Sequence, residues 1–418
     1  MASQAVENTS RVRRWVQEWK DLLDAPVATY YIVLWCVVLL TSFGLIMVLS
    51  ASSITSYAGG EGSPFTVFMR QAIFAVAGLI MMFIVARFKV GTWKKLAPVF
   101  LLGGLALQVL PLTPLGVEVN GNRSWFSVGG GFRVQPAEFV KIALSLYIGR
   151  FMAAKIRELS TFTVVMPVLA ATGLSIGLVI AGHDLGTGLI LIAVALGALF
   201  VGGLPWKWLM MLASVAVAGV LALVLTNANR LARIQALFTG HSSDVTDPLG
   251  QHWQSNHGLY ALASGGWLGV GLGGSREKWA WLPEAHNDFI FAIIGEELGL
   301  VGTLAVVVLF ALLSYGIVRV IMRSQDRFVQ TVSAGLLAWL VGQAFMNIAV
   351  VTGLLPVIGV PLPFVSYGGS SLAATLLAAG VLLSFARSES GASEALASRG
   401  IHMRSALLGR MSRKSKNG

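Results

Sequence analysis

Charge and cysteine are both scarce in this sequence. Asp, Glu, Lys and Arg together make up only 12% of its 418 residues, about half the share of roughly 25% in an ordinary soluble protein. So few charged side chains cannot cover the surface of a water-soluble globule of this size. The only cysteine is Cys36, which excludes a secreted disulfide scaffold. Hydrophobic residues make up 56% of the chain, which excludes a disordered protein and leaves a polytopic membrane protein.

Long apolar runs predict where the chain crosses the membrane. A spanning helix needs about 20 mostly apolar residues. The predicted spans are residues 30–50, 67–86, 96–115, 137–153, 162–182, 187–204, 206–226, 289–318, 329–352 and 369–386. The fold class is therefore all-α, with about ten transmembrane helices and a large extracytoplasmic loop, residues 227–286, between helices 7 and 8. Segment 137–153 is the least typical span, because it contains Glu138 and Lys141.

Lys and Arg are distributed unevenly between the connections. Most of the 30 basic residues fall on the same side as the N-terminus if the spans alternate, and such an excess marks the cytoplasmic side. We therefore expect both termini in the cytoplasm. The expected organisation is a cytoplasmic extension over 1–28, a membrane domain over 29–387 and a basic, disordered cytoplasmic tail over 388–418. Because the basic residues are dispersed beside spans, they indicate contact with membrane lipid and not with nucleic acid.

Two long connections, 111–136 and 227–286, face outward in this topology and indicate extracytoplasmic work. The second predicts an amphipathic helix from Arg230 to Phe238 and a glycine-rich stretch from Gly265 to Gly274. The stretch fits a G-x-G-x-x-G pattern, but no strand precedes it, so we interpret the glycines as turns. His252 and His257 have no carboxylate near them in sequence, and a solvated pair is favoured over a zinc site.

Asp288 is the strongest functional candidate, because it lies where a polar loop becomes an apolar helix. Helix capping is the alternative interpretation for this position. Glu296 and Glu297 follow within the same predicted span, and carboxylates inside a span are costly enough to be functional candidates by default. Glu296 lies about two turns below Asp288.

Two further sites lie at the same outward level. Asp184 occupies the tight turn between two spans, where it could cap a helix or contribute to a site. Glu138 and Lys141 are three residues apart, so one helix face can carry both. They could form a neutral structural pair or bind substrate.

Basic, aromatic and hydroxyl groups complete the outward set. Arg123, Arg276 and Lys278 oppose the charge bias and suggest an anionic ligand, while Trp125 could be a ligand or an interfacial residue. In segment 361–371, Ser366 and Ser370 follow or flank glycine and proline turns. They could present an anion site at a helix N-terminus or simply cap it.

Five of these segments together resemble the motifs of the SEDS family (shape, elongation, division, sporulation). They are residues 135–141 (QPAEFVK), 184–187 (DLGT), 282–291 (LPEAHNDFIF), 353–356 (GLLP) and 361–371 (PLPFVSYGGSS). The segments occur in the family's order. The Pro-Glu-Ala-His form of the third segment, the polar tail and the N-terminal extension are more similar to the division-type member than to the elongation-type.

The resemblance implies a ten-helix glycosyltransferase that polymerises lipid II into peptidoglycan at the outer face of the cytoplasmic membrane, at the division septum. It implies a class B penicillin-binding protein as transpeptidase partner, beside other divisome membrane proteins. Asp288 matches the family's essential aspartate, and Glu138, Lys141 and Asp184 match positions around its central cavity. Lys278 matches a lysine before the Leu-Pro-Glu segment.

Three positions depart from the family pattern. Ser124 separates Arg123 from Trp125, where the family has Arg and Trp adjacent; His183 stands in place of proline, and Asn287 in place of threonine.

The resulting hypothesis assigns Asp288 as the base that accepts the proton of the acceptor's 4-hydroxyl. Arg123, Lys278, Lys141 and Arg276 would contact the departing pyrophosphate, and Trp125, Glu138, Asp184, Glu296, Ser366 and Ser370 would contact substrate. No cofactor or dedicated metal-ligand cluster is expected, although a divalent cation could assist at the pyrophosphate. The alternatives are a lipid II flippase, the elongation-type polymerase and a non-catalytic scaffold.

Overall fold

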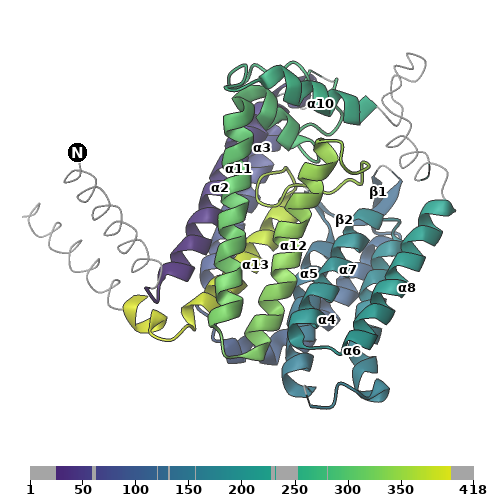
Figure 1. Ribbon diagram of the computed structural model, residues 1–418. Coiled ribbons are helices and arrows are strands. Elements are labelled where there is room, and N and C mark those ends of the chain that lie inside the picture. The colour runs from purple at the N-terminus through teal and green to yellow at the C-terminus, as the bar shows by residue number, and fades with distance from the viewer. Residues whose placement is uncertain are drawn as a thin grey trace, which may run out of the picture.

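The computed structural model describes residues 25–58, 63–119, 121–129, 132–155, 157–226, 231, 253–279 and 281–396. Within these ranges the architecture is a bundle of ten long helices (Figure 1). They are α2 (Ala28–Ala58), α3 (Thr66–Val85), α4 (Val90–Val109), α5 (Pro136–Lys155), α6 (Phe162–Ala181), α7 (Leu185–Gly202), α8 (Trp206–Leu225), α11 (Ile290–Arg323), α12 (Arg327–Val351) and α13 (Gly369–Arg387). Each corresponds to one predicted span, which confirms the all-α membrane class.

Nine of these helices in the described part of the chain are long and apolar enough to cross a membrane. The tenth, α5, carries Glu138 and Lys141 and contacts α4, α7 and α12. It lies within the bundle (Figure 1), where protein rather than lipid surrounds its charged residues.

Burial separates inner from outer helices. In the most apolar 18-residue stretch of α13, 89% of the residues are buried, whereas the corresponding share in α8 is 11%. α13 packs against α3 and α2, and α12 packs against α7, α5 and α11. The inner helices therefore provide a fixed frame, and α8 presents most of its surface to lipid.

A small antiparallel sheet, which the sequence did not predict, occupies the connection between α4 and α5. A 3-10 turn, η1 (Leu110–Leu112), precedes β1 (Gly116–Val119), β2 (Asn122–Gly129) and β3 (Phe132–Val134), in that spatial order. Val117 pairs with Trp125, and Phe126 pairs with Val134. The backbone N–H of Arg123 also donates to the Gly182 carbonyl at 2.9 Å, which ties the sheet to the turn between α6 and α7.

The helix that follows Asp288 is broken at Gly299, whose φ of 64° and ψ of −161° suit only glycine. α10 (Trp253–Gly265) and the loop after it pack against this break (Figure 1). The loop N–H groups of Val270 and Gly271 donate to the Glu296 and Glu297 carbonyls at 2.9 and 3.0 Å. These bonds satisfy carbonyls that the break leaves without helical partners.

The glycine-rich stretch forms turns, as predicted, because Gly269, Gly271 and Gly273 all have positive φ. The predicted helix from Arg230 to Phe238 and the predicted histidine pair at His252 lie wholly or partly outside the described residues.

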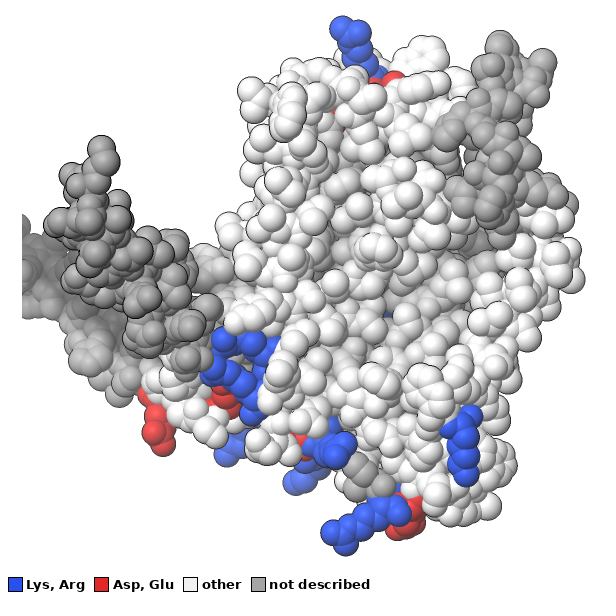
Figure 2. Space-filling view, viewed as in Figure 1, with Lys and Arg blue, Asp and Glu red and all other residues white. Residues whose placement is uncertain are grey.

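Charged side chains gather mainly at one end of the bundle, the lower end in Figure 2. Two ion pairs there join separate helices: Lys94 to Asp326 at 2.6 Å and Arg323 to Glu389 at 2.8 Å. The side surface between the two ends is almost free of charge in this view, as expected of a belt that faces hydrocarbon.

Candidate active site

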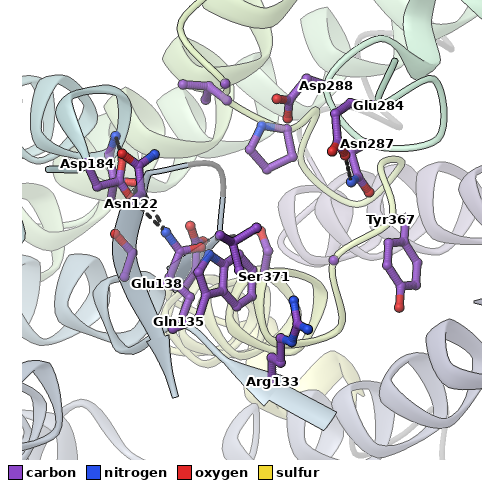
Figure 3. Close-up of a pocket in the computed structure, with 18 of the residues that line it drawn as sticks. Asn122, Arg133, Gln135, Glu138, Asp184, Glu284, Asn287, Asp288, Tyr367 and Ser371 are labelled. Carbon is purple, nitrogen blue, oxygen red and sulfur yellow. Dashed lines mark hydrogen bonds between the residues drawn. The ribbon is translucent and has the colours of Figure 1, made fainter. Parts of the chain in front are cut away.

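A polar cavity of about 810 Å³ lies at the end of the bundle that carries the sheet and α10. Its walls come from β2, β3, α5, α7 and α12 and from the segments that lead into α11 and α13 (Figure 3). Five predicted site residues line it: Trp125, Glu138, Lys141, Asp184 and Asp288. Segments far apart in the sequence therefore converge on one polar volume.

The backbone before α11 is held firmly in this wall. The carbonyls of three consecutive residues, 286 to 288, each accept a hydrogen bond from another segment. The donors are the Tyr367 N–H at 2.9 Å, the Ser366 hydroxyl at 2.7 Å and the Asn347 side-chain amide at 2.7 Å. Because these three hydrogen bonds hold the main chain, the backbone that carries the Asp288 side chain is positioned by the fold.

The Asp288 carboxylate itself accepts no hydrogen bond from the described residues, and Phe289, not Asp288, is the N-cap of α11. The capping interpretation therefore does not apply. The carboxylate faces the cavity near Glu284 and Asn287 (Figure 3). A carboxylate that is not engaged by the protein is free to accept a proton from a bound molecule.

Burial raises the pKa of Asp288 from 3.8 to about 7, and the like charges of Glu284 and Asp184 add to the rise. Burial also lowers the pKa of His286, although Glu284 acts in the opposite direction. A neutral His286 supplies no positive charge that would counter the ionisation of Asp288. Asp288 thus titrates near neutral pH, as a general base should.

Asp184 combines both predicted roles. Its carboxylate caps α7 by accepting the Thr187 N–H at 2.9 Å, and it also accepts the Thr187 hydroxyl at 2.8 Å. The Gln135 amide donates to it at 2.9 Å, from the start of α5. These bonds occupy the Asp184 carboxylate, so its place in the cavity wall is fixed by the protein.

Glu138 and Lys141 form a buried ion pair in the opposite wall, with an N–O distance of 2.8 Å. Lys141 also donates to Gln343 at 3.0 Å, and its ammonium lies 4.8 Å from the Trp339 ring centroid. The Ser371 hydroxyl donates to Glu138 at 3.3 Å. The pair is therefore structural and also lines the cavity, and its contact with substrate stays a prediction.

The remaining predicted contacts lie outside the cavity lining. The Arg123 guanidinium donates to the Thr113 carbonyl at 3.3 Å. Ser370 accepts the Gln135 N–H at 3.1 Å. The Ser366 hydroxyl accepts the Leu362 N–H and donates to the Asn287 carbonyl, both at 2.7 Å. These three side chains bond to the protein backbone and do not line the cavity, so their role as substrate contacts stays a prediction.

Lys278, Arg276 and Glu296 belong to a second buried cluster, at the broken part of α11. Lys278 pairs with Glu297 at 2.8 Å, and both side chains are at least 98% buried. Glu296 accepts the Ser275 hydroxyl at 2.5 Å and the Arg276 N–H at 2.8 Å. This cluster anchors the loop after α10 to the half-helix that follows Asp288, and the structure does not bring it to the cavity.

Arg70 and Arg133 line the cavity instead and were missed as ligands. Both oppose the charge bias, which was the signal that selected Arg123 and Lys278. Gln135 and Gln343 were also missed, although an amide within an otherwise apolar span, as at Gln343, is a signal of its own. Arg133 lies across the cavity from Asp288 in Figure 3, so a cation faces this carboxylate from the opposite wall.

Backbone strain is also concentrated here. Three non-glycine residues in the described chain have positive φ: His183 at 66°, Glu284 at 56° and Phe364 at 65°. His183 precedes Asp184, and Glu284 lines the cavity. Such conformations persist where the surrounding structure enforces them, and they cluster at functional sites.

No group of three or more His, Cys, Asp or Glu side chains within the described ranges could hold a metal ion. His257 contacts the Glu277 carboxylate at 2.5 Å. The sequence did not predict this partner, because Glu277 is 20 residues away from His257.

The fold and the cavity define a polytopic membrane protein with a carboxylate-lined polar cavity at one end of an apolar helix bundle. Comparison with known proteins gives the family. Residues 30–391 match the FtsW/RodA/SpoVE family, described as cell cycle proteins, and the chain belongs to that family.

Two curated relatives illustrate the match. One is the probable peptidoglycan glycosyltransferase FtsW of Halorhodospira halophila, 41% identical over 357 residues, which are 84% of this chain and 88% of that protein. The other is stage V sporulation protein E of Bacillus subtilis, 37% identical over 84% of this chain and 94% of that protein.

A solved structure, described as "Structural coordination of polymerization and crosslinking by a peptidoglycan synthase complex", has the same fold. Its superposition on this chain has a TM-score of 0.67 and covers 86% of this chain and 98% of that chain, and the two sequences are 24% identical.

Proposed function

We propose that this protein is a peptidoglycan glycosyltransferase that polymerises lipid II at the outer face of the cytoplasmic membrane during septal synthesis. Relatives that bear the name of this activity are similar over most of the chain. The observation that carries the mechanism is Asp288, a cavity-facing carboxylate without a hydrogen-bond donor among the described residues and with a pKa of about 7.

In this mechanism the Asp288 carboxylate takes the proton of the acceptor sugar's 4-hydroxyl as its oxygen attacks the donor's anomeric carbon. The bond from that carbon to the pyrophosphate breaks, and undecaprenyl pyrophosphate leaves with the electron pair. Direct displacement inverts the anomeric centre and needs no covalent enzyme intermediate.

The cations of the opposite wall would stabilise the departing pyrophosphate. Arg133 is exposed and lines the cavity, and Arg70 lines it from α3. Lys141 is already paired with Glu138, so its contribution to the charge of the cavity is partly neutralised. We therefore assign the pyrophosphate contacts first to Arg133, which is exposed, and then to Arg70 and Lys141. A divalent cation at the pyrophosphate stays a hypothesis, and no step here depends on it.

The proposal includes a class B penicillin-binding protein as the transpeptidase partner, in line with the synthase complex whose fold this chain shares. It also places the chain at the division septum with other divisome proteins. The charged end of the bundle in Figure 2 would face the cytoplasm, with both termini there, and the cavity would face outward.

The test is reconstitution of the purified protein with fluorescent lipid II, with and without the class B partner. Polymer should form and should appear as a ladder of glycan products on a gel. Transfer of labelled lipid II across the membrane without polymer would identify a carrier, and the absence of both would leave a scaffold.

A further inference from the structure

A stack of aromatic rings lies between the start of α10 and the segment that leads to Asp288. It consists of Trp253, His257 and Trp281, hereafter the ring stack. The Trp253 and His257 centroids are 4.2 Å apart, and the His257 and Trp281 planes are 16° from parallel at 6.0 Å. Trp253 and Trp281 are 24° from parallel at 6.2 Å. The Trp253 and His257 planes are tilted by 36°, and the Trp281 centroid lies about equally far from both, so the three rings form a compact triangular cluster.

Local chemistry fixes this arrangement. Trp253 and His257 are four residues apart on α10, so they share a helix face. The indole N–H of Trp253 donates to the Trp281 carbonyl at 2.6 Å, which joins the two segments. His257 pairs with Glu277 at 2.5 Å. The ring stack is therefore held in place by polar bonds as well as by ring contacts.

The ring stack is open at its outer side. Trp281 is 54% exposed, and Tyr260, whose ring meets His257 edge-on at 5.6 Å, is 58% exposed. Exposed aromatic faces beside a partly exposed imidazole and carboxylate combine an apolar plane with hydrogen-bonding groups.

The ring stack also adjoins the cavity through both of its segments. Gln254, the residue after Trp253, lines the cavity, and so does Glu284, three residues after Trp281. The ring stack therefore lies beside the part of the cavity wall that these two residues form.

We propose that the ring stack binds the glycan strand as it emerges from the active site. The inference rests on the proposed function, since it assigns a position to the product of that reaction. A pyranose ring has one face of C–H groups, which packs on an aromatic plane, and a rim of hydroxyl and acetamido groups, which can bond to His257 and Glu277. Holding the strand there keeps its end near Asp288 for the next addition.

An interfacial aromatic belt is the competing explanation for exposed tryptophans. It accounts for Trp267 and Trp279, which are 77% and 62% exposed on the same loop region and lie outside the ring stack. It does not account for the His257–Glu277 contact or for the Trp253 bond to the Trp281 carbonyl, which fix the ring stack within the protein.

The experiment measures binding without turnover. Full-length protein with the Asp288→Asn substitution, in lipid nanodiscs, is titrated calorimetrically with a lipid-free octasaccharide of alternating N-acetylglucosamine and N-acetylmuramic acid. We expect binding that Trp281→Ala weakens about three- to ten-fold. The matched control, Trp279→Ala, removes a tryptophan of similar exposure and should leave the affinity unchanged. In protein with Asp288 intact, Trp281→Ala should also shorten the polymer.

Equal affinities for the Trp281→Ala and Trp279→Ala variants, or no binding by the parent, would overturn the inference. So would quenching of Trp281 fluorescence by brominated lipid in a variant that retains only this tryptophan, since it would place the ring in the bilayer. These outcomes are distinct from failure of the proposed function, which is measured as the absence of polymer from the unsubstituted protein.

Discussion

Replacement of Glu284 by Gln should shift the pH dependence of polymerisation to lower pH. Asp288 must be ionised to act as a base, so the rate should rise as the pH passes through its pKa. Glu284 is one of the two like charges that raise this pKa from 3.8 to about 7. The amide removes that charge and keeps an oxygen that can accept from Asn287, which now donates to Glu284.

The size of the shift follows from the order of the causes. Burial is the largest cause of the rise in the pKa of Asp288 from 3.8 to about 7, so the Glu284 charge accounts for less than half of that rise. A pKa that falls from about 7 to about 6 would raise the ionised fraction at pH 6 about five-fold and leave the rate at pH 8 almost unchanged.

The assay is the initial rate of lipid II polymerisation between pH 5 and 9 at saturating substrate. Glu118→Gln is the matched control, because Glu118 carries the same charge at an exposed position on β1 outside the cavity lining. A profile for Glu284→Gln that coincides with the control, or that moves to higher pH, would refute the assignment of Asp288 as the titrating base.

Three further predictions concern packing and substrate contacts. Lys278→Met should lower the free energy of unfolding by about 3–5 kcal/mol, because it leaves the Glu297 carboxylate buried without its cationic partner. The double variant with Glu297→Gln should recover part of the thermal stability. A fully stable Lys278→Met protein with a raised KM would instead support the predicted contact between Lys278 and the pyrophosphate. Arg133→Ala should raise the KM for lipid II by about ten-fold or more without changing the melting temperature, whereas Arg123→Ala should have the smaller effect on KM; the reverse order would contradict the cavity assignment. Gly299→Ala should lower the free energy of unfolding by about 1–3 kcal/mol, because the backbone conformation of Gly299 is accessible only to glycine. An unchanged melting curve would contradict this prediction.

The helix bundle was predictable because lipid leaves few alternatives. A run of about 20 apolar residues can satisfy its backbone only as a helix, so each predicted span reappears as one helix of the structure. Asp184 and Asp288 could be selected for a similar reason, since carboxylates at the ends of apolar helices have a high desolvation cost.

The cations of the site were not predictable, because they depend on side-chain direction. On β2 the Arg123 guanidinium turns to the Thr113 carbonyl, whereas its neighbours Asn122, Ser124 and Trp125 line the cavity. An all-α interpretation of this connection contains no sheet and therefore gives no direction for these side chains. Arg133 lines the cavity from β3.

The role of Lys278 depended on long-range packing. Its partner Glu297 lies beyond the cavity wall, and Ser50 from α2 donates to the same carboxylate at 2.8 Å. Sequence spacing does not reveal that α2, α11 and the loop after α10 meet at this point. The same limit applies to the His257–Glu277 pair, which joins residues 20 positions apart.

The most direct test of the central claim is the polymerisation rate of Asp288→Asn protein that folds and binds lipid II normally. The amide has the shape of the carboxylate but cannot take the acceptor's proton, so the rate should fall by about 10²- to 10⁴-fold at every pH, with the melting temperature and lipid II affinity retained. A rate within a few-fold of the unsubstituted protein would show that another group accepts the proton.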